Sequence, residues 1–458
     1  MKRFWLVLLT LGLVMAFSTS VFAADVKFTG SFYAAGMYLD NTSFMGNGSE
    51  KPSTAFYYQR MRIKAEFIAT PALKLVTRFD AMERMWGHVR STVAAAPLVT
   101  APDVDSYGTR AENENIAFDY AYVWYASKIG IFEVGIMEDG VWGTVFGDNS
   151  EPEGKIKYTF IKMPFIAGLQ IVKFNEFSDN AVNASIYTDR DVDKYQGFFI
   201  YNWKGGQAGL LCIFINNRSL KPNFWPTPST YAQKIYGAQP YVKAKFGPVA
   251  VEAEAWYLGG EAVKWEDDAP IIIIPPLVTT QDTDLSAWSV YVNAVADFNM
   301  FYFGGTFAYL SGDDDTTTDK VEGGPGTVNG GRDWNPCLIM FNWDRNYWAG
   351  ASNGWGASTD AGVMSNAYFG QLKAGVRPIS DLDIALSVAY AKADKLPTGY
   401  SEKDYGWEVD ATATYKITNN LSYMLGAGFL FTGDYYKAAT TNDVEDNFIV
   451  LNKLTLTF

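Results

Sequence analysis

The chain has 458 residues, with 37 Lys and Arg against 50 Asp and Glu, one His and two Cys. Its net charge of −13 argues against nucleic acid as a partner, because phosphate binding requires an exposed basic surface. A single histidine, His88, disfavours zinc sites and catalysis by a histidine base, so we expect no enzyme, no metal and no cofactor. A membrane-embedded hydrolase that uses His88 is the enzymatic alternative.

The first 23 residues are typical of a secretory signal peptide. Lys2 and Arg3 precede an apolar stretch over residues 4–17, and small residues follow as far as Ala23. This stretch is too short to span a bilayer comfortably. We therefore expect residues 1–23 to be removed, which leaves 35 basic and 50 acidic side chains and a net charge of −15.

Residues 24–458 are expected to form one domain built from strands. Apolar and polar side chains alternate over residues 57–67, and again over 288–298, 407–417 and 421–431. These runs are about 10 to 15 residues long, roughly twice the usual length of strands in soluble sheets. Strands of that length suit a tilted crossing of a bilayer.

The connections between the alternating runs are of two kinds. Short turns are expected near Pro71-Ala72, Lys128-Ile129, Met163-Pro164, Gly205-Gly206, Gly247-Pro248, Asn299-Met300, Ile379-Ser380 and Asn419-Asn420. Long loops are expected near residues 40–54, 87–113, 140–153, 177–191, 218–230, 260–284, 312–364, 394–403 and 434–443.

This count of connections predicts a transmembrane, antiparallel, up-and-down β-barrel of about 18 strands. Sixteen strands is the alternative, because alternation is weak near residues 154–176 and 192–217. Closure of the barrel is expected because hydrocarbon offers no hydrogen-bond partner to an open sheet edge. An even number of strands brings both ends of the chain to the same side of the membrane.

The last residues carry a recognisable pattern, with apolar side chains at alternate positions before a terminal aromatic residue. The residues concerned are Phe448, Val450, Asn452, Leu454, Leu456 and Phe458. This pattern resembles the C-terminal assembly signal of Gram-negative outer-membrane proteins, and Asn452 is its one departure.

Over most of its length the chain also resembles putative porins of delta-proteobacteria, which are distantly similar to alginate-export barrels. Residues 60–67, 142–148 and 334–339 carry this resemblance. It implies a channel in the outer membrane of a Gram-negative bacterium, in contact with lipid and lipopolysaccharide. A homotrimer is one assembly that the resemblance implies.

If the apolar side chains face lipid, the charged ones between them face the lumen, because a charge at the bilayer midplane costs about 2 to 4 kcal/mol. The expected pore-lining residues are Arg60, Arg62, Lys64, Glu66, Lys74, Arg78, Asp80, Arg84, Lys243, Lys245, Lys373 and Arg377. A turn at residues 70–72 pairs Arg62 with Asp80 and Lys64 with Arg78. The cations then form either a basic ladder that attracts anions or cross-links in the barrel wall.

Other inward positions are acidic, namely Glu252, Glu254, Glu408 and Asp410, so a preference for anions is a hypothesis. The loop over residues 140–153 corresponds by its order to the loop that folds inward in many porins. Its candidate constriction residues are Trp142, Phe146, Asp148 and Glu151. The alternative for this segment is an ordinary surface turn.

The longest loop, residues 312–364, contains Trp334, Trp343, Trp348 and Trp355. A loop of this length is usually functional or disordered, and four tryptophans argue against disorder. It either enters the mouth of the barrel, where aromatic faces would stack on sugar rings, or packs on itself. Calcium binding by Asp313, Asp314, Asp315 and Asp319 is disfavoured because the EF-hand spacing is absent. A disulfide between Cys212 and Cys337 is also disfavoured.

These patterns together predict a channel for the passive diffusion of small hydrophilic solutes, with anion preference as a hypothesis. One alternative is an export or specific channel for an anionic polysaccharide. The other is a non-conducting barrel that displays its loops as an adhesin or receptor.

Overall fold

The computed structural model describes residues 25–46, 53–87, 116–176, 191–219, 231–265, 282–324, 326–350, 354–356 and 362–458. The expected signal peptide and His88 lie outside these ranges. The strands of the barrel wall are β1 (Asp25–Leu39), β2 (Thr54–Thr70), β3 (Leu73–Met85), β4 (Ile116–Ser127), β5 (Gly130–Asp139), β6 (Glu151–Lys162), β7 (Phe165–Asn175), β8 (Val192–Trp203), β9 (Gly206–Asn217), β10 (Tyr231–Phe246), β11 (Val249–Trp265), β12 (Thr283–Asp297), β13 (Phe301–Leu310), β15 (Ala367–Ile379), β16 (Leu382–Ala393), β17 (Asp404–Lys416), β18 (Leu421–Thr432) and β19 (Asn447–Thr457).

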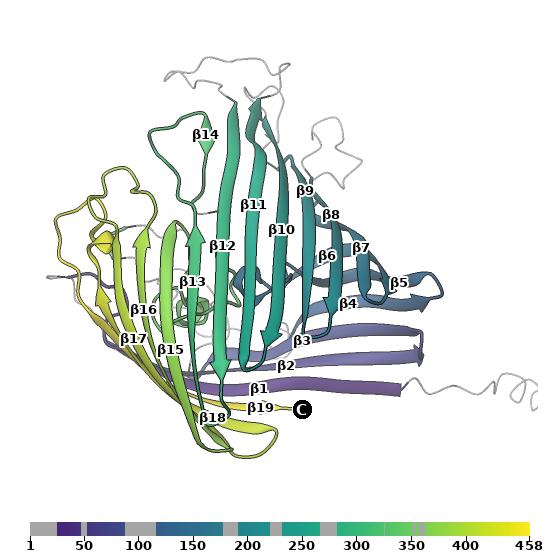
Figure 1. Cartoon of the computed structure of the whole chain (residues 1–458), viewed down its shortest axis with the longest axis horizontal. Coiled ribbons are helices and arrows are strands. Elements are labelled where there is room, and N and C mark those ends of the chain that lie inside the picture. The colour runs from purple at the N-terminus through teal and green to yellow at the C-terminus, as the bar shows by residue number, and fades with distance from the viewer. Residues whose placement is uncertain are drawn as a thin grey trace, which may run out of the picture.

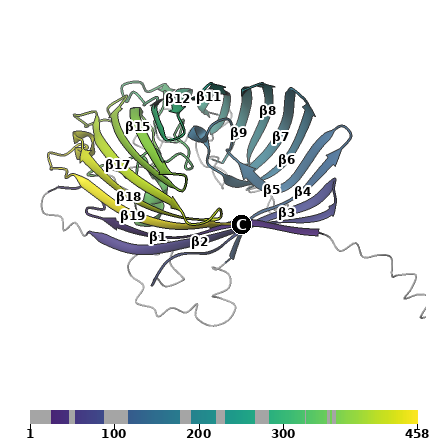
Figure 2. The same ribbon diagram turned by 60° about the horizontal axis from the view of Figure 1, so that its bottom comes forward.

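The wall strands form one closed antiparallel ring in which each pairs with its neighbours in the chain (Figures 1 and 2). The two-residue strand β14 (Lys320–Val321) lies in a loop and pairs with β12, so β13 pairs directly with β15. The ring closes where β1 pairs with β19. There Gly30 and Phe458 exchange backbone hydrogen bonds of 2.8 and 3.0 Å. The prediction of 18 strands is confirmed, and the alternative of 16 is wrong.

The eight short turns lie at or next to their predicted positions: two are shifted by one residue, to Lys204-Gly205 and Ser380-Asp381, and two are longer, over residues 298–300 and 417–420. The strands on either side of the nine predicted long loops end and begin close to the predicted bounds, except that β11 continues to Trp265 within the loop predicted at 260–284. The weakly alternating segments, residues 154–176 and 192–217, contribute to β6 through β9. These strands form despite their weak pattern because each supplies the hydrogen-bond partners that its neighbours in a closed ring require.

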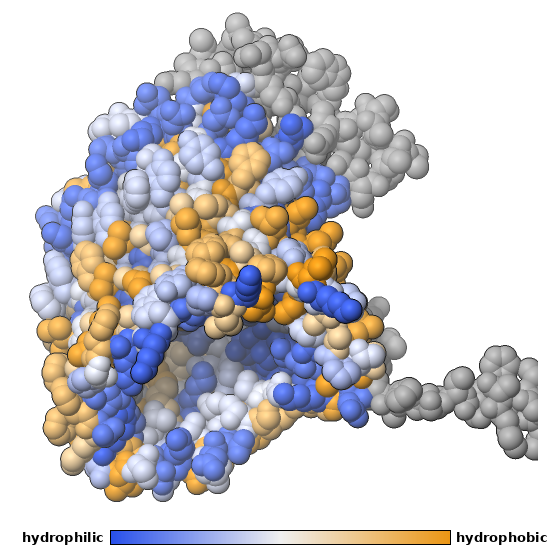
Figure 3. Space-filling view, turned by 45° about the vertical axis from the view of Figure 1, so that its right-hand side comes forward, coloured by the Kyte–Doolittle hydropathy of each residue, from blue (hydrophilic) through white to orange (hydrophobic). Residues whose placement is uncertain are grey.

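The outer face of the ring is apolar. Leu372 on β15 has 73% of its surface exposed and Leu169 on β7 has 67%. On β15 the flanking residues point the other way, and Gln371 donates a hydrogen bond to the Pro336 carbonyl of a loop inside the ring, at 2.6 Å. Figure 3 shows hydrophobic residues over the outer wall and hydrophilic residues in the hollow that it encloses.

None of the helices in the described ranges has the length and apolar character needed to cross a membrane. These helices are short: η2 (Val145–Gly147), α3 (Trp343–Ala349) and η4 (Asp434–Lys437).

A buried hydrophobic cluster lies inside the ring. Phe44, Phe146, Trp334, Met340 and Trp348 come from three different loops, and each is at most 8% exposed. They pack together with inward side chains of β1, β2, β12, β13 and β15 through β19. Part of the lumen is therefore filled by protein, and the charged residues of the remaining strands line the rest.

Gly406 on β17 sits opposite a register shift in β16, between Ala391 and Lys392. Its φ of +113° favours glycine, and an added Cβ would lie 2.0 Å from the Phe431 carbonyl oxygen. We expect Gly406→Ala to lower the free energy of unfolding by about 1–3 kcal/mol. Gly370→Ala on β15 is the control, since its Cβ would meet nothing within 4 Å. Urea titration of the barrel folded in vesicles measures the difference, and equal midpoints for the two variants would contradict the argument.

Candidate functional site inside the barrel

The loop between β5 and β6 folds into the lumen. Phe146, fully buried in η2, stacks on the ring of Tyr291 from β12 with centroids 4.9 Å apart. The backbone N–H of Thr144 donates to Glu254 Oε2 on β11 at 2.6 Å. Because these partners lie on strands several places further around the ring, the segment reaches across the lumen and is not a turn at the rim.

Each of the four expected constriction residues has a defined contact. The indole N–H of Trp142 donates to the Gln239 carbonyl at 2.9 Å, and its backbone N–H donates to Asp148 Oδ1 at 2.8 Å. Burial raises the pKa of Asp148 to about 7. Glu151, the first residue of β6, forms an ion pair with Arg332 from the longest loop.

The longest loop also enters the barrel. Residues 333–350 are here called the plug. The backbone N–H of Asp333 donates to the Asp148 carbonyl, in the loop between β5 and β6, at 3.0 Å. Just before the plug, the N–H of Gly331 donates to the Phe146 carbonyl of the same loop at 2.6 Å. Trp334 meets the Phe146 ring edge to face, with centroids 5.0 Å apart. The two inward loops therefore support each other.

The remaining tryptophans of this loop have distinct positions. Trp348 packs on Tyr58 of β2, with centroids 4.5 Å apart. The Arg332 guanidinium lies over the Trp343 ring at 4.5 Å. Trp355 lies after the plug and donates its indole N–H to the Asp443 carbonyl of another loop at 2.8 Å. The sequence allowed two possibilities for this loop, entry into the barrel or packing on itself. Trp334 and Trp348 enter the barrel.

Two buried carboxylates hold the plug against the wall. Glu408 on β17 is fully buried and accepts the backbone N–H groups of Ile339 and Met340, each at 2.7 Å. Asp410, two residues further on, accepts the Leu338 N–H at 3.3 Å. Three consecutive plug amides thus find their acceptors on one strand, which satisfies donors that would otherwise be buried without a partner.

Glu408→Leu is expected to release the plug, because two buried N–H groups lose their acceptor at about 1–3 kcal/mol each. Hydrogen exchange in a peptide covering residues 336–342 should accelerate while exchange in the wall strands stays slow. Glu402→Leu, at an exposed loop position, is the matched control. Unchanged protection of residues 338–340 in the Glu408 variant would show that this carboxylate does not anchor the plug.

The remaining wall carries a network of ion pairs. The predicted register is confirmed, since Arg62 pairs with Asp80 and Lys64 with Arg78. Arg62 and Asp80 share two hydrogen bonds of 2.6 Å. Further pairs include Arg60–Glu83 at 3.4 Å, Arg78–Asp119 at 3.1 Å, Lys74–Glu66 at 2.9 Å and Lys64–Glu66 at 3.6 Å. In this hairpin the cations therefore act as cross-links, which favours the second of the two hypotheses.

Arg84 differs from its predicted position. A register shift opposite residues 59–61 inserts an extra residue in β3 at Met82, whose φ is +55°. Side chains beyond such a bulge exchange faces. Glu83 therefore faces Arg60, whereas Arg84 pairs with Gln59 on the face where Trp86 donates to the Gln59 side chain. Alternation alone assigned Arg84 to the lumen, and the bulge corrects this.

The other predicted lumen cations occupy different surroundings. Arg377 forms ion pairs with Asp297 and Asp383, each at 3.0 Å, beside the short turns. Lys243 and Lys245 line an open cavity of about 560 Å³ with Glu252 of β11. Neither lysine forms an ion pair with a described residue. Lys373 lines a second cavity, beneath the plug.

Several charged residues of this network were not singled out from the sequence, namely Glu83, Asp119, Glu133, Asp139, Lys155, Lys194 and Arg332. Asp139, 3% exposed, binds Lys155 at 3.0 Å and also pairs with Lys194. Period-two alternation could have placed Asp139 and Lys155 in the lumen, because Ile136 on β5 and Ile156 on β6 face outward at positions of opposite parity. Glu83 and Asp119 lie at register shifts and gave no such signal.

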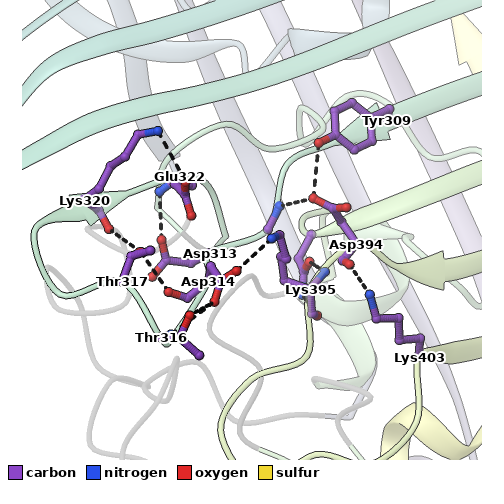
Figure 4. A network of polar contacts seen from close by, with 12 residues as sticks. Tyr309, Asp313, Asp314, Thr316, Thr317, Lys320, Glu322, Asp394, Lys395 and Lys403 are labelled. Carbon is purple, nitrogen blue, oxygen red and sulfur yellow. Dashed lines mark hydrogen bonds and ion pairs between the residues drawn. The ribbon is translucent and has the colours of Figure 1, made fainter.

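Contacts within the acidic loop and with neighbouring segments hold it in place, and Figure 4 shows those of Asp313 and Asp314. The Thr316 hydroxyl and the Lys395 ammonium donate to Asp314 at 2.6 and 2.9 Å and hold the pKa of that carboxyl well below its usual range. Asp313 accepts the Glu322 N–H at 2.8 Å. Asp315 accepts the N–H of Thr398, and the Asp319 carbonyl accepts that of Asp284 at 2.9 Å. Each of the four aspartates therefore makes a contact of its own.

The two cysteines are unbonded: Cys212 is exposed and Cys337 is buried. The expectation that they form no disulfide is confirmed. Cys337 lies next to Glu408 and Asp410, the one group of acidic and thiol ligands that gathers within the described part of the chain. The carboxylates of this group already accept the plug amides.

Because the pKa of Asp148 is raised, the stability of the folded inner loops should depend on pH. Because the pKa is about 7 in the folded chain and its ordinary value is 3.8, the folded state binds the proton more tightly than the unfolded chain. Stability should therefore be greatest below the ordinary pKa and fall as pH rises through about 7. In Asp148→Asn, which keeps the acceptor for the Trp142 N–H, this contribution should disappear.

Urea midpoints of the wild type and of Asp148→Asn, compared across that pH interval, check the expectation. Asp381→Asn, at an exposed turn, is the control and should keep the wild-type slope. Parallel curves for the wild type and Asp148→Asn would mean that this carboxyl does not titrate in the interval.

No protein-family model and no curated protein matches the chain. Its fold resembles the outer membrane protein OpdK from Pseudomonas aeruginosa, with 11% identity, 94% of this chain and 99% of that chain covered, and a TM-score of 0.49. OccK2 (OpdF) of the same organism, solved with glucuronate, is 10% identical over 95% and 97%, with a TM-score of 0.49. The anion-selective porin from Comamonas acidovorans is 9% identical over 95% and 100%, with a TM-score of 0.44. Identities this low concern the fold and carry no residue role.

Proposed function

We propose that this protein is an outer-membrane channel for the passive diffusion of small hydrophilic solutes, and not an enzyme. The observation that carries the proposal is a closed ring with an apolar outer face and a charged inner face, narrowed by two loops that bind each other inside it. A ring of this kind satisfies its backbone hydrogen bonds in hydrocarbon while it keeps a polar path.

The proposal includes a location in the outer membrane of a Gram-negative bacterium and contact with lipid and lipopolysaccharide. The proposal also includes a homotrimer, which rests only on the resemblance of the sequence to porins. The finer resemblance, to delta-proteobacterial putative porins and alginate-export barrels, stays a prediction. Residues 1–23 would act as the signal peptide that delivers the chain.

Anion preference is the finer part of the proposal. The ion pairs of the first hairpin, together with Asp119 of β4, offset much of its charge, so selectivity would arise from cations that form no ion pair. Lys243 and Lys245 are such cations within the described chain. Glu252, which lies opposite Lys243 in the register, instead accepts hydrogen bonds from Tyr291 at 3.0 Å and Asn293 at 3.2 Å. Lysines that form no ion pair attract anions to the lumen.

Planar-bilayer recording of the purified protein tests both parts. We expect stepwise conductance and a reversal potential, in a salt gradient, on the anion-selective side. Lys243→Gln combined with Lys245→Gln should move that potential toward zero, whereas Lys204→Gln, at an exposed turn, should not. Cation selectivity of the wild type would overturn the anion preference and leave the channel intact.

The same recording separates the two alternatives. Absence of conductance would favour a barrel that displays its loops as an adhesin or receptor. Block of the current by an anionic polysaccharide, together with little flux of neutral sugars, would favour a channel for that polymer. A diffusion channel should instead pass small neutral and charged solutes according to size.

A further inference from the structure

A partly open cavity lies beneath the plug, separate from the charged wall of β3 through β9. It has a volume of about 440 Å³ and is bounded by the plug and by side chains of β1, β2, β13 and β15 through β19. Pockets of this size hold small organic molecules.

Three cations line this cavity and form no ion pair with a described residue. Lys373 forms no ion pair, and the Lys453 ammonium lies 4.4 Å above the Tyr33 ring. Arg345 is 1% exposed and donates only to neutral oxygens. These are the Asn346 side chain at 2.8 Å and the carbonyls of Gly350 and Thr42 at 3.2 and 3.1 Å.

Two of the carboxylates that line the cavity accept hydrogen bonds from other residues. Asp383 accepts from Arg377 Nε at 3.0 Å and from the Tyr302 hydroxyl at 2.9 Å. Asp410 accepts the Leu338 N–H. Asp344, in the first turn of α3, and Asp410, whose partner is an uncharged amide, remain as two lining acids against three cations. A partly buried cation is costly without a counter-charge, so the cavity favours an anionic occupant.

The rest of the lining is largely apolar and includes Met37, Leu338, Met424, Ile449 and Leu451. Lys373 on β15 and Lys453 on β19 therefore line the same space as a thioether and aliphatic side chains. We propose that this cavity is a binding site for a small organic carboxylate with an apolar body, with Lys373 and Lys453 as the groups that bind the carboxylate. The site lies inside the proposed channel but does not require that the channel conducts.

Isothermal titration of the detergent-solubilised full chain with benzoate tests the site. We expect saturable binding that weakens about tenfold in Lys373→Met and in Lys453→Met, because a hydrogen bond to a charged group is lost in each. Lys204→Met removes an exposed turn lysine and should bind as the wild type does. Lys373→Arg, which keeps the charge, should retain most of the affinity.

The wild-type protein provides a test that does not depend on the folding of any variant. Benzoate should bind about tenfold more tightly than benzyl alcohol, which has the same ring without the charge. Equal binding of the two compounds, or no saturable benzoate binding, would overturn the site. Conductance is measured separately, so loss of the channel proposal and loss of this binding site are distinguishable results.

Discussion

The structure depends on one constraint, that every backbone amide of the wall has a partner on a neighbouring strand. In water an unpaired sheet edge is hydrated, but in hydrocarbon it is not. The β1–β19 pairing, with its exchange of hydrogen bonds between Gly30 and Phe458, removes the last edge. Once the ring is closed, alternation determines the rest: apolar side chains face outward, and charged side chains face an enclosed space where they pair with one another.

The architecture was predictable from the sequence because it depends on local patterns. Period-two alternation located the strands, and the turn residues located all eight tight turns. The same parity gave the pairing of Arg62 with Asp80, since a short turn fixes the register of its hairpin. Where the pattern was weak, as in β6 through β9, the count of connections was enough.

The site was less predictable, because its contacts join residues distant in the chain. Thr144 meets Glu254, and Ile339 meets Glu408, with no signal that links either pair. Loop order indicated that residues 140–153 fold inward but not which strands they reach. The bulge at Met82 is a second obstacle: one extra residue moves Arg84 to the opposite face and adds Glu83 as a partner for Arg60.

The plug lies late in the chain, yet it packs on strands from both ends of the sequence. Trp348 contacts Tyr58 on β2, and the plug amides bind Glu408 on β17. These two strands become neighbours of one lumen only when β19 has reached β1. The packing of the plug is therefore complete only in the closed ring, because the wall that it contacts belongs to both ends of the chain.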